Sequence, residues 1–375
     1  MSAPPRPRVL LLRGHQTNSW HLRPWRHLSD SYEVVALRTR RTWFDTASIG
    51  MDTRPVRALR DLLPPGRVGH ALARLPGDRY LQPRRALRDA DVVHSQDLGF
   101  WYSMQAARHK RALGYKLVLT VWETIPFLDA YRNVRTRPYR RRVLEATDLF
   151  LAATERARAA LLLEGAPEER VEVCPPGVDP PATAGADPHP GEHLVISAGR
   201  LVWEKGHQDV LRALAELRRR ESAPLPRLLI VGVGPERRRL ERYARELRVG
   251  DLVELRPEVP YAEMPALYAR ASCLVLASLP TWFWEEQFGM VLVEAVTAGL
   301  PVIAAASGAI SEVLRGQAPT FPPGDWPELA RLLERGPLSR PAGDRASYDS
   351  ALVHDYSGPA FASRLAAAYK RVLAA

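Results

Sequence analysis

WFWEEQFGMVLVEAVTAGLPVIAAASGAISEV, residues 282–313, is the most informative segment of this chain. An apolar run, CLVLAS at 273–278, precedes it, and a second run, PVIAAA at 301–306, lies within it. Between the two runs, from Gly289 onward, apolar side chains recur at helical spacing, and Gly299 is typical of a helix end. Strand, helix and strand in this order form a βαβ unit, the building block of parallel sheets.

The same alternation extends along the whole chain of 375 residues. In each half, short β-branched and leucine-rich runs alternate with longer stretches of helical period. The expected strands are 8–14, 32–38, 91–96, 116–123, 149–154 and 171–176, then 194–200, 227–234, 252–259, 273–278 and 301–306. Two α/β domains of the Rossmann type are predicted, because a single hydrophobic core rarely serves more than about 250 residues.

A segment rich in Pro, Gly and Ala separates the two sets of strands. It is DPPATAGADPHPGEH, residues 179–193, and has no apolar period, so we expect an interdomain linker there. The expected division is an N-terminal domain at 1–180 and a C-terminal domain at 191–350. Residues 351–375 are expected to form one final helix with an apolar stripe.

Composition narrows the class of protein. Lys and Arg number 53 against 42 Asp and Glu, a net charge of +11, and residues 1–190 hold most of the excess. Such a surface attracts anions, but no recognised nucleic-acid-binding fold accompanies it, so no nucleic acid is expected as a partner. Cys174 and Cys273 have no metal-ligand spacing and are expected to be reduced. Without a signal-peptide or membrane-spanning run, the expected location is the cytoplasm.

Two glutamates flank the expected helix start in the opening segment. Glu286 and Glu294 are separated by seven residues. The N–H groups of Gly289, Met290 and Val291, in the first helical turn, favour an anion such as a diphosphate. Carboxylates beside a phosphate suit a different task, which is to accept hydrogen bonds from sugar hydroxyls. An ordinary amphipathic helix with an incidental glutamate pair is the alternative.

A second cluster of charge follows the strand at 194–200. In GRLVWEKG, Arg200 and Lys205 flank a tight strand-to-helix loop. Arginine can bind two phosphate oxygens at once, and lysine adds a point charge that stabilises a leaving diphosphate. These two side chains are therefore candidate phosphate ligands, with a solvated loop pair as the alternative.

Taken in order, GRLVWEKG, LLIVGVGPE, CLVLAS and EEQFGMVLVEAVTAGLPVIA resemble the retaining family-4 glycosyltransferases of the GT-B fold. The resemblance covers roughly residues 191–315, and VCPPGVD at 173–179 resembles the end of that family's first domain. It implies two Rossmann-like domains that face a central cleft, with the acceptor on the N-terminal side and the nucleotide sugar on the C-terminal side. The last helix, 351–375, would cross back to the N-terminal domain.

The resemblance also implies roles for individual residues. Arg200 and Lys205 would bind the donor diphosphate, Glu286 the transferred hexose and Glu294 the ribose. Arg256 would lie near the base. The backbone that would assist the phosphates belongs to Phe288, Gly289, Met290 and Val291. The implied reaction is retaining hexosyl transfer without a cofactor or metal, since cations and a helix N-terminus carry the diphosphate charge.

The N-terminal half matches the family more loosely. Gly14 is the candidate for a glycine near the phosphates, and His15 for a contact on the acceptor side. The family commonly has a histidine where this chain has Trp122, so Glu123 is the candidate for a catalytic polar contact there, with a solvated or helix-capping carboxylate as the alternative. His94 and Asp97 lie just past a strand end and, like Trp122, are candidate acceptor-side groups; ordinary loop residues are the alternative for His94 and Asp97.

The partners follow from the same resemblance. The donor is expected to be a UDP- or GDP-sugar, and the acceptor a lipid-linked molecule, a glycan or a small natural product. The run Arg132–Arg142 suits anionic lipid headgroups at the inner membrane face, with a solvated helix face as the alternative. A nucleotide-sugar epimerase and a non-catalytic nucleotide-sugar-binding protein are the rival functions.

Overall fold

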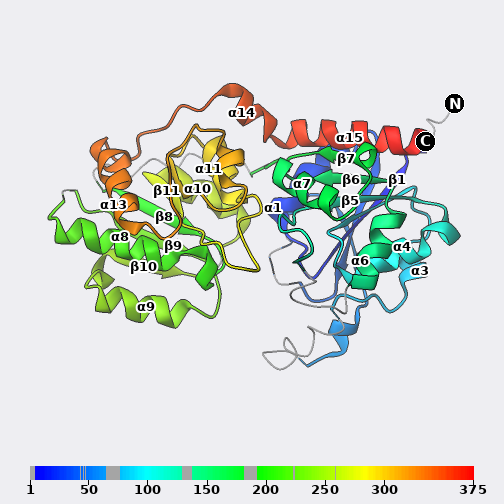
Figure 1. Ribbon diagram of the computed structural model, residues 1–375, viewed down its shortest axis with the longest axis horizontal. Coiled ribbons are helices and arrows are strands. Elements are labelled where there is room, and N and C mark those ends of the chain that lie inside the picture. The colour runs from blue at the N-terminus through cyan, green and yellow to red at the C-terminus, as the bar shows by residue number, and fades with distance from the viewer. Residues whose placement is uncertain are drawn as a thin grey trace. The chain divides into compact units, whose positions relative to one another are not determined.

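The computed structural model describes residues 5–42, 44, 46, 48–64, 77–128, 137–180, 192–222, 224–257 and 259–375. The chain divides into two compact units (Figure 1). We call Met1–Asp179 with Asp355–Ala375 the N-terminal unit, and Pro180–His354 the C-terminal unit. Most of the expected linker, 181–191, lies outside the described residues.

The N-terminal unit contains a parallel seven-stranded sheet in the order β3-β2-β1-β4-β5-β6-β7. The long central strand β1 is almost entirely buried, as expected of a strand covered on both faces. The strands are β1 (Arg8–Gly14), β2 (Glu33–Thr39), β3 (Asp52–Val56), β4 (Val92–Gln96), β5 (Lys116–Val121), β6 (Leu149–Ala152) and β7 (Val171–Val173).

The C-terminal helix α15 packs on the sheet of the N-terminal unit. Its Phe361, Leu365 and Tyr369 belong to one buried cluster with Val9 of β1 and Trp25 of η1. The helices of this unit are α1 (Ser19–Leu22), α3 (Pro83–Ala86), α4 (Trp101–Leu113), α6 (Arg137–Ala146), α7 (Glu155–Leu163) and α15 (Gly358–Ala374), with 3₁₀ turns η1 (Arg23–Leu28), η2 (Leu59–Leu62) and η4 (Glu168–Arg170).

The expectation of one helix over 351–375 is wrong, because the segment contains two. A short helix, α14 (Ser350–Asp355), ends before α15 begins. The side chain of Ser357 caps α15 by accepting a hydrogen bond from Ala360 N at 3.3 Å. Pro359 follows in the first turn, where it has no N–H to donate and would clash with a preceding helical turn.

The C-terminal unit contains a parallel six-stranded sheet in the order β10-β9-β8-β11-β12-β13. The strands are β8 (Leu194–Ala198), β9 (Arg227–Val231), β10 (Val253–Arg256), β11 (Cys273–Leu276), β12 (Val302–Ala305) and β13 (Thr320–Phe321). The helices are α8 (His207–Arg219), α9 (Arg237–Glu246), α10 (Met264–Arg270), α11 (Met290–Thr297), α12 (Ile310–Leu314) and α13 (Trp326–Arg335), with 3₁₀ turns η5 (Trp203–Lys205), η6 (Gly250–Leu252), η7 (Tyr261–Glu263) and η8 (Pro337–Ser339).

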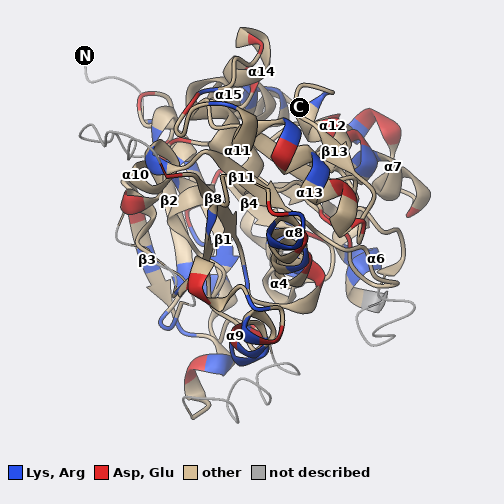
Figure 2. Cartoon of the chain, turned by 90° about the vertical axis from the view of Figure 1, so that its left-hand side faces the viewer, with Lys and Arg blue, Asp and Glu red and all other residues tan. Residues whose placement is uncertain are grey.

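One helix of this unit is notably basic. Arginines recur along α9, which Figure 2 shows as a largely blue coil. Several of them pair with glutamates one turn away, such as Arg237 with Glu241 at 3.0 Å and Arg239 with Glu236 at 2.9 Å. Exposed pairs of this kind contribute little to stability, so the basic face of α9 is solvated, whereas its Leu240 and Ala244 pack into the core of the unit.

The two Rossmann-like sheets confirm the predicted fold class, and all eleven expected strands are present. Most end earlier than expected, because the residues that follow them already belong to loops. The strands β3 and β13 were missed. β3 has the sequence DTRPV, whose charges and proline are tolerated at the exposed edge that it occupies. β13 has only two residues.

Each sheet has one place where the strand order reverses. In the N-terminal unit it lies between β1 and β4, and in the C-terminal unit between β8 and β11. The loops that follow these strands run in opposite directions, so a crevice opens outside the carboxyl ends of the strands, where ligands bind in open α/β sheets. Functional side chains are therefore expected after β1 and β4 and after β8 and β11.

Candidate functional site

The loop after β8 is pressed against the end of β11. Gly206 has a φ of +68°, and a Cβ at this position would lie 1.7 Å from the carbonyl oxygen of Ala277. Only glycine fits there. The neighbouring Glu204 accepts a hydrogen bond through its carbonyl from Leu279 N at 2.8 Å. The two loops at the reversal point of the C-terminal unit are therefore joined through their backbones.

A buried histidine, which the sequence did not single out, supports the same loop. The Nδ1 of His207 lies 2.8 Å from Ser197 Oγ, and its Nε2 lies 3.2 Å from the carbonyl oxygen of Arg200. Burial lowers the pKa of His207 to about 4, so the ring is neutral near pH 7. A neutral ring donates from one nitrogen and accepts at the other, so Nε2 donates to Arg200 and Nδ1 accepts from Ser197.

The centre of the site is an ion pair between the two loops. Lys205 Nζ lies 2.6 Å from Oε2 of Glu286, and Ser278 Oγ donates to the same oxygen at 2.7 Å. The ammonium also lies 4.9 Å from the ring centre of Trp284. The backbone carbonyl of Glu286 accepts from Ala309 N at 2.9 Å. Glu286 is therefore fixed at both its side chain and its backbone.

Arg200 differs from Lys205 in its surroundings. Its side chain is 53% exposed, and its guanidinium lies 3.9 Å from a carboxylate oxygen of Glu204. An exposed pair at that distance holds a side chain weakly. The loop therefore presents one cation that is fixed against Glu286 and one that extends into solvent.

The predicted helix start is where the sequence placed it. The helix α11 begins at Met290, with Gly289 as its N-cap, and ends before Gly299. Phe288 is 2% exposed, so its ring belongs to the core and only its backbone is offered to a ligand. The N–H groups of Met290 and Val291 belong to the first turn, where a helix has no internal acceptors for them.

Glu294 lies one turn further along α11 and is buried. Its Oε2 accepts a hydrogen bond from Tyr268 OH at 2.7 Å. Burial raises the pKa of Glu294 to about 7, against the opposing effect of hydrogen bonds from Tyr268 and Tyr261. The carboxyl group is therefore held by α10 and η7, with 6% of the residue exposed.

Arg256 also lies at the carboxyl ends of the strands, but in β10, which is two strands away from β8. It is the last residue of β10, and its guanidinium donates to Glu254 Oε1 at 2.6 Å. Its carbonyl accepts from Gly232 N at 3.1 Å, which ties it to the loop after β9.

In the N-terminal unit, the acidic candidates hold the loop after β5. Asp97 follows β4, and its Oδ1 accepts from Trp122 N at 2.9 Å and from Glu123 N at 3.4 Å. Glu123 in turn accepts from Thr124 N and Ile125 N, both at 3.0 Å. Burial raises the pKa of both carboxyl groups, that of Glu123 to about 7. Glu123 therefore caps a turn, as in the alternative interpretation of the sequence. The ring of Trp122 lies 5.1 Å from that of His21.

The placement of His94 at a strand end is wrong. It lies in the middle of β4 with no exposed surface. Its Nδ1 is 2.6 Å from Tyr369 OH of α15, and its Nε2 is 2.6 Å from Thr120 Oγ1 of β5. Burial, with Arg13 nearby, lowers the pKa of His94 well below its ordinary value. His94 is a neutral core residue that joins the sheet to α15, because both ring nitrogens are engaged inside the unit.

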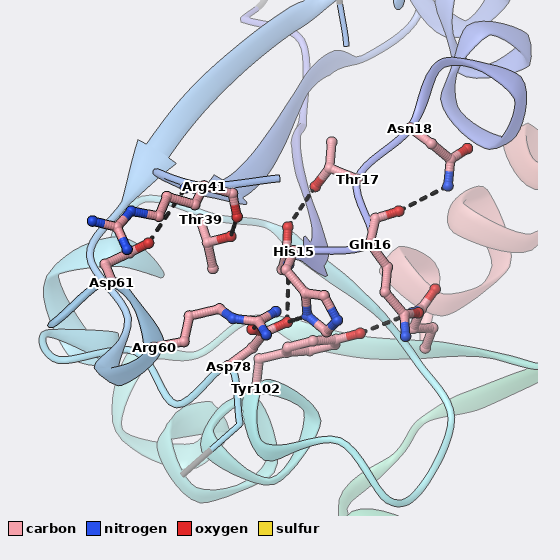
Figure 3. Close-up of polar contacts among 12 residues, drawn as sticks. His15, Gln16, Thr17, Asn18, Thr39, Arg41, Arg60, Asp61, Asp78 and Tyr102 are labelled. Atoms are coloured by element: carbon pink, nitrogen blue, oxygen red, sulfur yellow. Dashed lines mark hydrogen bonds and ion pairs between the residues drawn. The ribbon is translucent and has the colours of Figure 1, made fainter. Parts of the chain in front are cut away.

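Gly14 and His15 end β1 and begin the loop at the reversal point of the N-terminal unit (Figure 3). His15 N donates to Oδ2 of Asp78 at 2.9 Å, and its imidazole Nδ1 contacts the same oxygen. Asp78 was not a sequence candidate. It lies 63 residues further along the chain, outside any strand, so no spacing in the sequence indicates the contact.

The basic run lies partly outside the described residues, which begin again at Arg137. Within α6, Arg140 pairs with Glu164, and Arg141 pairs with Glu145 at 2.9 Å on an exposed face. Among the described residues, no helix combines the length and apolar character needed to cross a bilayer. In that same part of the chain, no group of three His, Cys, Asp or Glu side chains is arranged to hold a metal ion.

Family models match both halves of the chain. A model described as "Glycosyl transferases group 1" matches residues 185–340, and one described as "Glycosyltransferase Family 4" matches residues 23–181. A D-inositol 3-phosphate glycosyltransferase of Streptosporangium roseum is 30% identical over 316 residues, which cover 76% of this chain and 70% of that protein.

Two further relatives align over shorter regions. A D-inositol 3-phosphate glycosyltransferase of Nocardia farcinica is 33% identical over 206 residues, 51% of this chain and 44% of that protein. A GDP-mannose-dependent alpha-(1-6)-phosphatidylinositol monomannoside mannosyltransferase of Mycolicibacterium smegmatis is 33% identical over 193 residues, 48% of this chain and 50% of that protein. The chain thus spans about half the length of these two relatives.

Among solved structures, the chain is similar to Anabaena HepE in complex with UDP-glucose. The TM-score is 0.74 at 17% sequence identity, over 97% of this chain and 99% of that one. This likeness concerns the fold.

Proposed function

Because this chain belongs to the group 1 glycosyltransferases, we propose that it transfers a hexose from a UDP- or GDP-sugar to an acceptor hydroxyl with retention of anomeric configuration. The observation that carries this proposal is the ion pair of Lys205 and Glu286, which joins the two loops at the reversal point of the C-terminal unit. A relative is named GDP-mannose-dependent, and a structural neighbour contains UDP-glucose, which supports both donor classes.

The cations of the loop after β8 suit the diphosphate of such a donor. An ammonium group has three N–H donors, so Lys205 can keep its bond to Glu286 and still donate to a phosphate oxygen. Arg200 extends into solvent and presents a planar guanidinium that fits two phosphate oxygens. The first turn of α11 adds backbone N–H groups. Together they offset the charge that develops on the leaving diphosphate.

Glu286 suits the hydroxyls of the hexose. Its Oε2 already accepts from Lys205 and Ser278, which fixes the orientation of the group. An ionised carboxylate has about four acceptor sites, so capacity for sugar hydroxyls is left. We assign the ribose to Glu294 and the neighbourhood of the base to Arg256.

In the proposed reaction, the bond between the anomeric carbon and the diphosphate oxygen breaks. The acceptor oxygen bonds to that carbon on the same face, and its proton passes to the departing phosphate oxygen. Arg200 and Lys205 stabilise the leaving group without a metal ion. Glu123 is given no step, because it binds the backbone of its own turn.

A donor panel tests this function. Uridine, guanosine, thymidine and adenosine diphosphate sugars are added one at a time, and the melting temperature and the products are measured. A donor at 100 times its Kd stabilises the folded state by about 2.7 kcal/mol, which raises the melting temperature by roughly 3 °C if the whole chain unfolds together and by about twice that if the C-terminal unit unfolds alone. A donor that shifts the melting temperature and is slowly hydrolysed with retention supports the proposal.

Two results contradict it. If none of the four donors changes the melting temperature, the donor site is wrong. If a hexose is altered but remains on its nucleotide, the chain is an epimerase.

The same panel is applied to the variant Lys205→Met, which lacks the proposed phosphate contact. Lys370→Met is its matched control, because Lys370 is an exposed lysine on α15. The control variant is expected to bind the donor as the unmodified chain does.

A further inference from the structure

A short turn in the loop after β11 carries two tryptophans with different surroundings. Thr281 and Trp284 form an antiparallel bridge, in which Thr281 N donates to the carbonyl of Trp284 at 2.7 Å. Phe283 N donates to Thr281 Oγ1 at 3.4 Å, which closes the turn on itself. Trp282 at the tip is 70% exposed, whereas Trp284 is half-buried. The turn therefore leaves one indole ring in solvent and returns the other to the surface of the unit.

The ring that returns lies against the ammonium of Lys205. The Nζ of Lys205 is 4.9 Å from the ring centre of Trp284, and an aromatic face attracts a cation within about 6 Å. The lysine side chain is 15% exposed, so little water competes for the ammonium. The two loops are also joined by their backbones, because Leu279 N donates to the carbonyl of Glu204 at 2.8 Å. The loops therefore hold the ring and the ammonium at this distance.

The ring and Glu286 act on the ammonium in different ways. Glu286 Oε2 lies 2.6 Å from Lys205 Nζ and balances its charge, so a second carboxylate here would make the cluster negative and repel a diphosphate. An indole ring carries no net charge, yet the negative face of its quadrupole attracts the ammonium. It also restricts the flexible stem of the lysine before any phosphate binds. The ring therefore fixes the cation and leaves its charge available to the donor.

The other cation of the loop after β8 is held differently. The side chain of Arg200 is 53% exposed, and its guanidinium lies 3.9 Å from Glu204. Arg200 can follow a donor as it binds, whereas the ammonium of Lys205 is already in place. Preorganised charges stabilise a transition state most, because they need no reorganisation during the reaction. The ring that holds Lys205 is therefore expected to affect the rate of the reaction more than the affinity for the donor.

We propose that Trp284 is a positioning residue, whose indole ring holds the ammonium of Lys205 where the departing diphosphate needs it. The inference rests on the proposed function and adds a residue to it. Trp284 contacts no reacting atom and takes no proton, so it acts through Lys205 alone. Trp282, at the tip of the same turn, has no such role and is the matched control.

The contact is tested first without a donor. The lysines of the chain are Lys110, Lys116, Lys205 and Lys370. Labelling with ¹³C-lysine therefore gives few NMR signals, and that of Lys205 is identified by its loss in Lys205→Met. Protons above the face of an aromatic ring resonate upfield, which we expect of the Cε protons of Lys205. Trp284→Leu is expected to return them to the ordinary position, and Trp282→Leu to leave them shifted. An ordinary position in the unmodified chain overturns the proposal.

Turnover then shows what the contact does. Trp284→Leu removes the ring and is expected to lower kcat about five- to thirtyfold, as for a cation–π contact shielded from water, with less effect on KM. Trp284→Phe keeps an aromatic face and is expected to recover part of the loss. Trp282→Leu is expected to match the unmodified chain. The melting temperature of each variant is measured, and turnover is expressed per folded molecule. Full turnover in Trp284→Leu overturns the proposal.

A double-mutant cycle separates positioning from support of the fold. Because the ring acts through the ammonium, Trp284→Leu is expected to lower kcat in the unmodified chain and to change it little in Lys205→Met. An equal fold loss in both backgrounds would show that the ring supports the loop without acting on Lys205, which overturns the proposal.

The charge distribution of the ring is tested last. Tryptophans with increasing numbers of fluorine atoms are placed at position 284 by suppression of a stop codon. Fluorine changes the size of the ring little but withdraws electron density from its face, which weakens its attraction for a cation. We expect kcat to fall stepwise along this series, and to stay unchanged when the series is placed at position 282. A kcat that is independent of fluorination at position 284 overturns the proposal, whereas the absence of donor turnover in the unmodified chain contradicts the proposed function instead.

Discussion

The two sheets share one strand order, apart from the additional strand β7 of the N-terminal unit, but they present different chemistry at equivalent places. In the C-terminal unit, the loops at the reversal point meet through an ammonium and a carboxylate, Lys205 and Glu286. In the N-terminal unit, the carboxylates of Asp78 and Asp97 instead accept hydrogen bonds from the backbone of neighbouring loops. The fold fixes where a ligand binds, and the side chains decide the chemistry of that place.

Lys205→Met tests this contrast with the largest expected effect. Removal of one preorganised charge donor to a leaving group costs about 10²- to 10³-fold in kcat. Donor turnover is measured beside Lys370→Met, which is expected to match the unmodified chain. Because Glu286 loses its partner, the melting temperature is also measured, and turnover is expressed per folded molecule. Full turnover in Lys205→Met contradicts the assignment.

Glu294 predicts how the stability of the C-terminal unit depends on pH. Its pKa is about 7 in the folded chain, against an ordinary glutamate value of 4.5, so the folded state binds the proton more tightly. The contribution of this proton to the free energy of unfolding is fully present below pH 4.5 and is lost as the pH rises through 7. At about 1.4 kcal/mol for each pKa unit, the loss is on the order of 3 kcal/mol.

Glu294→Gln is expected to flatten the decline of unfolding free energy between pH 5 and 7.5, by chemical denaturation, to roughly the extent of that loss. Part of the decline is expected to remain, because burial also raises the pKa of Glu123 to about 7. A variant as dependent on pH as the unmodified chain would show that Glu294 titrates normally.

His94→Leu tests the N-terminal unit, where we expect a loss of stability and not of activity. The substitution leaves Tyr369 OH and Thr120 Oγ1 without a partner inside the N-terminal unit. The expected loss of unfolding free energy is about 2 to 6 kcal/mol, at about 1 to 3 kcal/mol for each of the two buried groups left unsatisfied. Donor turnover per folded molecule is expected to stay unchanged. The substitution His354→Leu, at an exposed histidine, serves as the control. A selective loss of turnover in His94→Leu would show that His94 takes part in the functional site.

The smallest expected effect is on donor affinity, from substitution of His207. Its Nε2 donates to the carbonyl of Arg200, and a single hydrogen bond of this kind contributes about 0.5 to 1.5 kcal/mol. His207→Asn, which does not reach that carbonyl, is expected to weaken donor binding about two- to twelvefold by calorimetry. His207→Gln, which does, is expected to weaken it less. Equal affinities in the two variants would show that the contact does not support the loop.

The sequence was informative where a function depends on neighbouring residues. The βαβ alternation predicted both sheets, and the start of α11 at Gly289 could be read from glycine and helical spacing. The contacts that it did not predict join distant segments. Asp78 meets His15 across 63 positions, and His94 meets Tyr369 across 275, so only the folded chain brings them together.

The split of the final helix was missed for a different reason. The apolar stripe of 351–375 continues on both sides of Ser357, and periodicity therefore gave no sign of the break. The signal was present in the residues Ser357 and Pro359, which form an N-cap followed by a first-turn proline.

A crystal structure of the full chain with UDP or GDP, chosen by the larger rise in melting temperature, tests the central claim most directly. We predict that the diphosphate oxygens lie within hydrogen-bond distance of Lys205 Nζ and of the first N–H groups of α11, with Arg200 turned toward them. A diphosphate bound at the loop after β1, with Lys205 contacting no phosphate, would contradict the account.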